Sequence, residues 1–187
     1  SEGGIIAPIV ASRSKDVNFI VLLAGTGIRG DKLLLLQSEL ISRANGISEE
    51  IIQMGKEANS GIFEILINNK DEASLTRELT DFLKEFSEKN PQDEYIPEGM
   101  TLDEVIAGKV EVVVNPWMAY FIKHDPAPVL EKVSCAVLAV NGDKDLQVPA
   151  KENLTAIKEA LNRGGNEKVT TIEFENLNHL FQECTTG

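Results

Sequence analysis

The stretch that decides the fold is residues 135–149, which read C-A-V-L-A-V-N-G-D-K-D-L-Q-V-P. Residues 135–140 are all apolar, as expected of a strand that is covered on both faces of a parallel sheet. A loop with two carboxylates, Asp143 and Asp145, follows this run. Pro149 then opens a predicted helix over residues 149–162, because proline favours the first turn of a helix.

Two further runs of residues complete this pattern. Residues 169–174 read V-T-T-I-E-F and alternate in polarity, which predicts a strand at the edge of the sheet. Residues 17–24 are nearly all apolar, which predicts a buried strand. A strand, a helix and a second strand in succession form a βαβ unit with parallel strands. The sequence therefore predicts an α/β fold with about three parallel strands and flanking helices.

The section between residues 31 and 122 differs from the rest, because its apolar residues recur at helical spacing. A capping box, Thr101-x-x-Glu104, predicts the start of one of its helices. A helical block that interrupts a βαβ pattern is typical of an inserted domain. We therefore expect a core formed by residues 1–30 and 123–187, with a helical cap inserted at residues 31–122.

Composition excludes several classes of partner. The chain has 187 residues and a formal net charge of −12, which argues against nucleic acid and anionic membranes because both attract basic surfaces. No apolar run is long enough to span a bilayer. Cys135 and Cys184 form no metal-binding pattern, so we expect neither a metal nor a cofactor. None of these features decides the localisation.

Side chains suited to catalysis follow both strands of the predicted βαβ unit. Asp145 comes after the first of these strands and His179 after the second. Both should emerge at the carboxyl edge of the sheet, where open α/β sheets bind ligands. The chain begins with Ser1-Glu2-Gly3, which matches the second half of a G-x-S-x-G nucleophile elbow. The order serine, aspartate, histidine is that of the α/β-hydrolase triad.

Together these motifs resemble the C-terminal part of an α/β-hydrolase, of the serine esterase type with a helical cap, starting at the nucleophile elbow. The resemblance spans nearly the whole chain and rests on residues 1–4, 18–25, 125–128, 142–149 and 178–179. It implies hydrolysis of a carboxylic ester or a related acyl bond through an acyl-enzyme. A small-molecule acyl ester is then the expected substrate.

This resemblance implies a role for each residue of the triad. His179 would accept the proton of the Ser1 hydroxyl, which is a weak nucleophile without a base. Asp145 would orient the imidazole and stabilise its cation. The backbone N–H of Glu2 would be one donor of the oxyanion hole. The second donor normally comes from a loop that would precede residue 1, and one missing donor costs about 100- to 1,000-fold in rate. We therefore expect the chain alone to be a truncated hydrolase of low activity.

Several residues compete for these roles. Asp143 is a rival for the triad acid, although Asp145 matches the glycine-to-aspartate spacing of the family and Asp143 is expected to shape the turn. His124 is the only other histidine in the sequence, and its proline context favours a loop. Trp117 and Phe121 are candidate substrate contacts, with core packing of a short helix as the alternative.

Other functions also fit the sequence. An acyltransferase or a serine peptidase would use the same scaffold, and an N-terminal nucleophile hydrolase would activate Ser1 through its own amine. A different alternative is a non-catalytic fragment. The strand at residues 17–24 would expose an apolar edge, and such edges recruit other chains. That alternative predicts a homo-oligomer formed through the sheet edge or through an uncovered sheet face.

Overall fold

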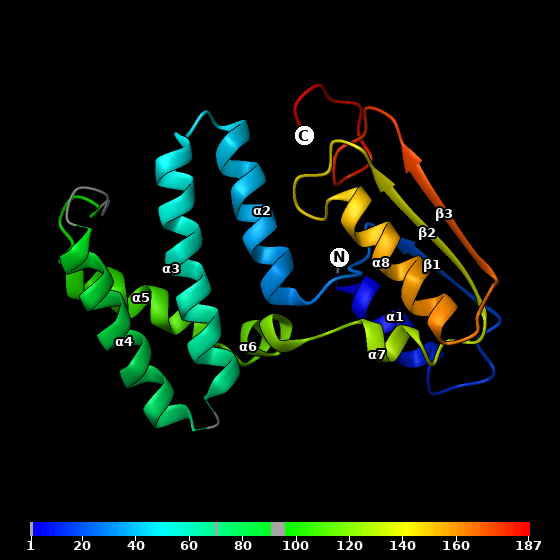
Figure 1. Ribbon diagram of the computed structural model, residues 1–187, viewed down its shortest axis with the longest axis horizontal. Coiled ribbons are helices and arrows are strands. Elements are labelled where there is room, and N and C mark those ends of the chain that lie inside the picture. The colour runs from blue at the N-terminus through cyan, green and yellow to red at the C-terminus, as the bar shows by residue number, and fades with distance from the viewer. Residues whose placement is uncertain (1, 70, 91–95) are drawn as a thin grey trace. The chain divides into compact units, whose positions relative to one another are not determined.

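A computed structural model describes residues 2–69, 71–90 and 96–187 (Figure 1). The chain divides into two compact units. One unit, Ser1–Asn45 with His124–Gly187, contains the sheet and is called the sheet unit below. The other, Gly46–Lys123, is called the helical unit.

The predicted α/β fold class is confirmed in the sheet unit. Its strands are β1 (Phe19–Leu23), β2 (Ala136–Gly142) and β3 (Val169–Phe174). They form one sheet in the order β1-β2-β3, and both neighbouring pairs are parallel. Parallel strands end at the same edge, so the segments that follow all three emerge together there.

Helices cover one face of this sheet. They are α1 (Gly3–Ala11), α7 (Ala127–Leu130) and α8 (Ala150–Arg163), which connects β2 to β3 and crosses in front of the strands in Figure 1. Alternate strand residues point into the core beneath them, among them Ile20, Leu22, Val137 and Ala139. Ile157 of α8 is fully buried in the same core.

The opposite face of the sheet is largely exposed. Phe19 is 68% exposed and Leu23 is 56% exposed, and Val21 between them is also exposed. Ile172 and Phe174 of β3 continue this surface. Strand β1 is therefore apolar on both faces, but only one of its faces is covered. The residues named in this paragraph are called the open face below.

Helix α2 (Gly30–Ala44) belongs to the sheet unit. The sequence pattern predicts that the helical insertion starts at residue 31, whereas the division between the units falls after Asn45. Two hydrogen bonds tie α2 to later parts of the sheet unit. The Gly30 N–H donates to the carbonyl of His124, at 3.0 Å, and Gln37 Nε2 donates to the carbonyl of Gln147, at 3.4 Å.

The helical unit holds α3 (Glu49–Asn68), α4 (Glu72–Lys89), α5 (Leu102–Val114) and α6 (Pro116–Lys123). Its core contains fully buried side chains from three of these helices, namely Leu66, Leu79 and Ile106. The predicted capping box at Thr101 and Glu104 is confirmed, with both of its reciprocal hydrogen bonds present. The helical spacing of residues 46–123 therefore corresponds to helices in the structure.

Membrane-spanning potential can be judged for the part of the chain that the structure describes. No single helix there combines the length and the hydropathy needed to cross a membrane. Helices α5 and α6 satisfy the test only when they are taken together, by length and composition, and they meet at a 65° bend.

Candidate active site

The candidate site lies where the segments after β2 and β3 touch. Strand β2 ends at Gly142, and a side-chain Cβ at this position would overlap the carbonyl group of Leu177. Glycine therefore allows the turn after β2 and the loop after β3 to meet with their backbones in contact. The Lys144 N–H donates to the same Leu177 carbonyl, at 3.1 Å.

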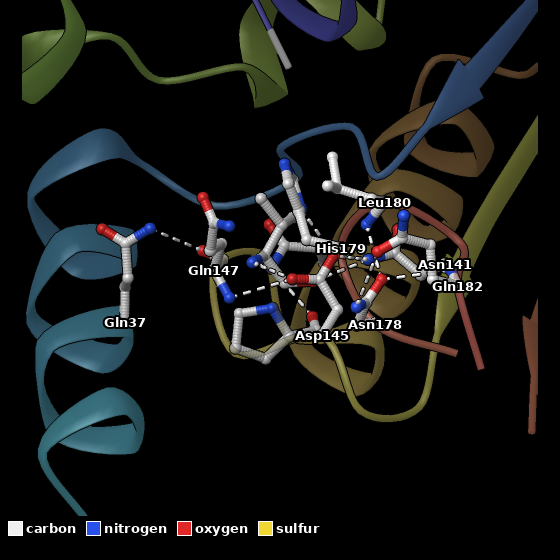
Figure 2. A network of polar contacts seen from close by, with 11 residues as sticks. Gln37, Asn141, Asp145, Gln147, Asn178, His179, Leu180 and Gln182 are labelled. Carbon is white, nitrogen blue, oxygen red and sulfur yellow. Dashed lines mark hydrogen bonds and ion pairs between the residues drawn. The ribbon is translucent and has the colours of Figure 1, made fainter. Parts of the chain in front are cut away.

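Asp145 and His179 form a hydrogen-bonded pair at this junction (Figure 2). His179 Nδ1 lies 2.8 Å from Asp145 Oδ2. The Asp145 side chain is 0% exposed, and that of His179 is 18% exposed. The structure thus brings together the aspartate and the histidine that the sequence analysis selected.

The Asp145 carboxylate accepts four hydrogen bonds. Its Oδ1 accepts the N–H groups of Gln147, at 2.9 Å, and Val148, at 2.8 Å. Its Oδ2 accepts from Asn141 Nδ2, at 3.3 Å, and from His179 Nδ1. A carboxylate only accepts hydrogen bonds, so the neutral imidazole carries its proton on Nδ1. Nε2 is then left as the acceptor, which is the tautomer that a general base needs.

Asn141 supports this carboxylate and was missed by the sequence analysis. It is fully buried near the end of β2, and its Nδ2 also donates to the Val148 carbonyl, at 2.6 Å. Two acceptors on one side fix the orientation of the amide. Its Oδ1 has no hydrogen-bond partner among the described residues, which costs about 1–3 kcal/mol for a buried acceptor. The only sequence signal was a polar residue inside an apolar strand.

The loop that carries His179 is held by side chains on both sides. Asn178 Oδ1 accepts the N–H groups of Leu180, at 3.0 Å, and Gln182, at 3.1 Å. Asp143 Oδ1 accepts the N–H of Asn176, at 2.6 Å, and so links the turn after β2 to this loop. Asp143, the rival for the triad acid, therefore shapes the loop, whereas Asp145 contacts the imidazole.

The start of α1 lies at the same edge of the sheet. A Cβ on Gly4 would come within 2.8 Å of the Cα atom of Gly25, which follows β1. The Glu2 carbonyl accepts the N–H groups of Ile5, at 3.0 Å, and Ile6, at 3.1 Å, and so opens the helix. N–H groups in the first turn of a helix favour negative charge beside them. Ser1, the candidate nucleophile, lies outside the described residues.

The remaining candidates do not contact this pair through any hydrogen bond that the structure shows among the described residues. Trp117 and Phe121 belong to α6 of the helical unit, where their rings stack at 5.3 Å with an interplanar angle of 8°. His124 lies where the chain returns to the sheet unit, and its carbonyl accepts from Gly30. Burial lowers the pKa of His124, and the charge of Asp125 opposes this effect.

A cleft of about 430 Å³ opens beside His179. Its walls are the last turn of α2, the turn after β2, the loop after β3 and residues 186–187, all within the sheet unit. The first three walls each contribute an apolar side chain, namely Ile41, Leu146 and Leu180. A cleft of this size suits a small ligand.

Comparisons with protein-family models, with curated proteins and with solved structures find no match to this chain. Within the described residues, no group of three or more His, Cys, Asp or Glu side chains is arranged to hold a metal ion. The Asp145–His179 pair and the cleft beside it are the two features of this site that bear on its chemistry.

Proposed function

We propose that the protein is a serine hydrolase of the α/β-hydrolase type, which cleaves a carboxylic ester or a related acyl bond. The observation that carries this proposal is the contact between a fully buried carboxylate, Asp145, and His179 Nδ1 at 2.8 Å. This contact leaves Nε2 of a partly exposed imidazole as a base. The first turn of α1, which follows Ser1, packs at the same edge of the sheet.

The proposed reaction has two steps. The Ser1 hydroxyl attacks the acyl carbon while His179 Nε2 accepts its proton, and the leaving alcohol then takes that proton as the acyl-enzyme forms. Water attacks the acyl-enzyme in the second step, with the same imidazole as its base. Asp145 stabilises the imidazolium in both steps, and the Glu2 N–H donates to the oxyanion.

The geometry favours this reaction over an N-terminal nucleophile mechanism. In that mechanism the α-amino group of Ser1 would be the base, and a buried carboxylate with four donors would have no role. Keeping a charged carboxylate away from water is costly unless its hydrogen bonds are made. The burial of the Asp145 carboxylate and its four hydrogen bonds are explained when the imidazole is the base.

The test is ester hydrolysis by the full-length protein. With p-nitrophenyl acetate as substrate, Ser1→Ala and Asp145→Asn should each lower kcat by about 10⁴-fold, the scale known for losing a triad member. His124→Gln is the matched control, because it changes the other histidine, and kcat should stay within about twofold. Unchanged turnover in Ser1→Ala would contradict the proposal, as would loss of turnover in the control alone.

A further inference from the structure

The cleft beside His179 is lined by side chains that are apolar or polar but almost never ionisable. Apart from His179, none of the described residues that line it has an ionisable side chain. This is unusual in a chain of which 26% is Asp, Glu, Lys or Arg. A charged group placed in this cleft would lose water and would meet no acidic or basic side chain other than the His179 imidazole, which is unfavourable. A neutral group would meet no such cost.

Two of the apolar side chains that line the cleft are exposed to solvent. Leu180 directly follows His179 and is 69% exposed, although its N–H is fixed by Asn178 Oδ1 at 3.0 Å. Ile41 on α2 is 37% exposed. An exposed leucine on a constrained backbone next to a base gains free energy when an apolar group covers it.

The walls that carry these side chains are tied together. Gln37 Nε2 of α2 donates to the carbonyl of Gln147, at 3.4 Å, and the Gln147 N–H donates to Asp145 (Figure 2). One chain of hydrogen bonds thus runs from α2 through the turn after β2 to the carboxylate that orients His179. The helix that forms one wall of the cleft is therefore connected by hydrogen bonds to the residue that orients the imidazole.

We propose that this cleft binds the aliphatic part of a neutral ester, with Leu180 and Ile41 as its specificity-determining contacts. The inference rests on the proposed function, because it takes the cleft as the place where the substrate lies beside His179. Substrates with a carboxylate, phosphate or ammonium group on that aliphatic part are excluded. Neutral esters with a short alkyl chain are preferred.

A binding experiment tests this without relying on turnover. Three ligands of similar length are titrated against the protein while its methyl NMR signals are recorded: hexanamide, hexanoate and hexylammonium. Hexanamide should shift the signals of Ile41, Leu146 and Leu180, and both ions should bind at least about tenfold more weakly. Equal binding of an ion, or hexanamide shifts confined to other residues, would overturn the proposal.

Variants sharpen the same experiment. Leu180→Ala should weaken hexanamide binding by about tenfold, because most of the apolar contact is lost, and Ile41→Ala should weaken it less. The control is Ile6→Ala, which removes a side chain of α1 that is 50% exposed and does not line the cleft. Both cleft side chains are exposed, so the variants should fold. Unchanged affinity in Leu180→Ala would contradict the assignment.

The two proposals fail in different ways. If hexanamide binds as described but Ser1→Ala retains ester hydrolysis, the proposed function is wrong and the cleft remains a site for neutral ligands. If Ser1→Ala abolishes hydrolysis but the three ligands bind alike, the function stands and the specificity inference is wrong.

Discussion

Asn141 shows, at the scale of single residues, how a side chain outside the proposed triad can decide its geometry. The residue donates to Asp145 Oδ2 and to the Val148 carbonyl from a fully buried position. These two bonds tie the end of β2 to the middle and to the end of the turn that carries the carboxylate. The imidazole contact therefore depends on Asn141 through Asp145.

The first prediction concerns Asn141→Ala. This change leaves the Val148 carbonyl without its side-chain donor and should lower the free energy of unfolding by about 1–3 kcal/mol. It should also lower kcat for p-nitrophenyl acetate by about tenfold, with little change in KM, because Asp145 loses a donor. Asn162→Ala, at an exposed position of α8, is the control and should stay within about 0.5 kcal/mol. Equal stability of the two variants in urea unfolding would show that the buried amide is dispensable.

Asp145 and His179 could be selected from the sequence, but their supporting residues could not. Each of the two follows a recognisable strand, so parallel topology was enough to place both at one edge. Asn141 and Asn178 act through hydrogen bonds to backbone groups of neighbouring turns. Their roles depend on loop conformations that residue type and spacing do not determine.

At the scale of elements, the entry into α1 depends on the absence of a side chain at Gly4. The second prediction is that Gly4→Ala lowers the free energy of unfolding by about 1–3 kcal/mol, because the new methyl group would press on the Gly25 backbone. Gly55→Ala is a matched control, since a Cβ there meets nothing within 4 Å inside α3. The control should be stabilised by about 0.5–1 kcal/mol through helix propensity.

These two variants are compared by thermal and urea unfolding. If Gly4→Ala is as stable as Gly55→Ala, the close approach of α1 to the end of β1 is not required. If Gly4→Ala also loses ester hydrolysis while Gly55→Ala retains it, the packing of α1 against Gly25 is needed for activity as well as for stability.

An ion pair at the start of α2 should contribute to the stability of the fold in a pH-dependent way. Arg29 Nε and Nη2 each donate to Asp31, at 2.6 Å, in the first turn of α2. Burial raises the pKa of Asp31, but the hydrogen bonds from Arg29 and the Lys32 amide, with the charges of both residues, bring it below its ordinary value. The carboxylate form is therefore favoured in the folded chain.

The third prediction follows from the sign of this shift. A carboxyl group with a lower pKa in the folded chain stabilises the fold at pH values above its unfolded pKa of about 3.9, and this contribution is lost as the pH falls through the folded value. Asp31→Asn should cost about 1 kcal/mol at pH 7, since Arg29 is partly exposed, and almost nothing at about pH 2. Urea unfolding at both pH values tests this.

Asp16→Asn is the control, because Asp16 is exposed, and its stability should differ little from that of the parent at either pH. A loss of stability in Asp31→Asn that persists at low pH would contradict the account.

Helices and strands could be told apart in the sequence because their apolar residues recur with different periods. The residues at which they begin and end could not, because these depend on the neighbouring strand or helix. The strand predicted at residues 169–174 coincides with β3, but the run at residues 17–24 is shortened to Phe19–Leu23. Pairing of β1 begins where Phe19 lies opposite Ala136. Residues at the ends of an apolar run that do not pair with a neighbouring strand have the same composition as those that do. The sequence alone therefore does not show where the strand begins and ends.

At the scale of the whole molecule, the division into two units was expected, but its boundary was not. The leucine stripe of α2 has the same period whether the helix packs in the helical unit or in the sheet unit. Its assignment to the sheet unit rests on distant partners, His124 and Gln147. Such tertiary contacts are invisible to periodicity, and α2 consequently supplies one wall of a cleft that the sequence did not predict.

The fourth prediction concerns the open face of the sheet. Phe19, Val21 and Leu23 form an exposed apolar row on β1, and exposed apolar strands at a sheet edge recruit other chains. We expect the protein to self-associate as its concentration rises, and Leu23→Lys to shift this association to at least about tenfold higher concentration by placing a charge in the row. Ile47→Lys, at an exposed position of the helical unit, is the control and should associate like the parent. A monomer at every concentration in sedimentation experiments would contradict this prediction.

The central claim is that His179, oriented by Asp145, activates a serine nucleophile at Ser1. Its most direct test is to label the full-length protein with a fluorophosphonate, which phosphonylates an activated serine with loss of fluoride, and to map the modified residue by mass spectrometry. We predict labelling at Ser1, slowed at least about 100-fold in His179→Gln and unchanged in His124→Gln. Labelling at another residue, or at Ser1 with the same rate in His179→Gln, would contradict the account.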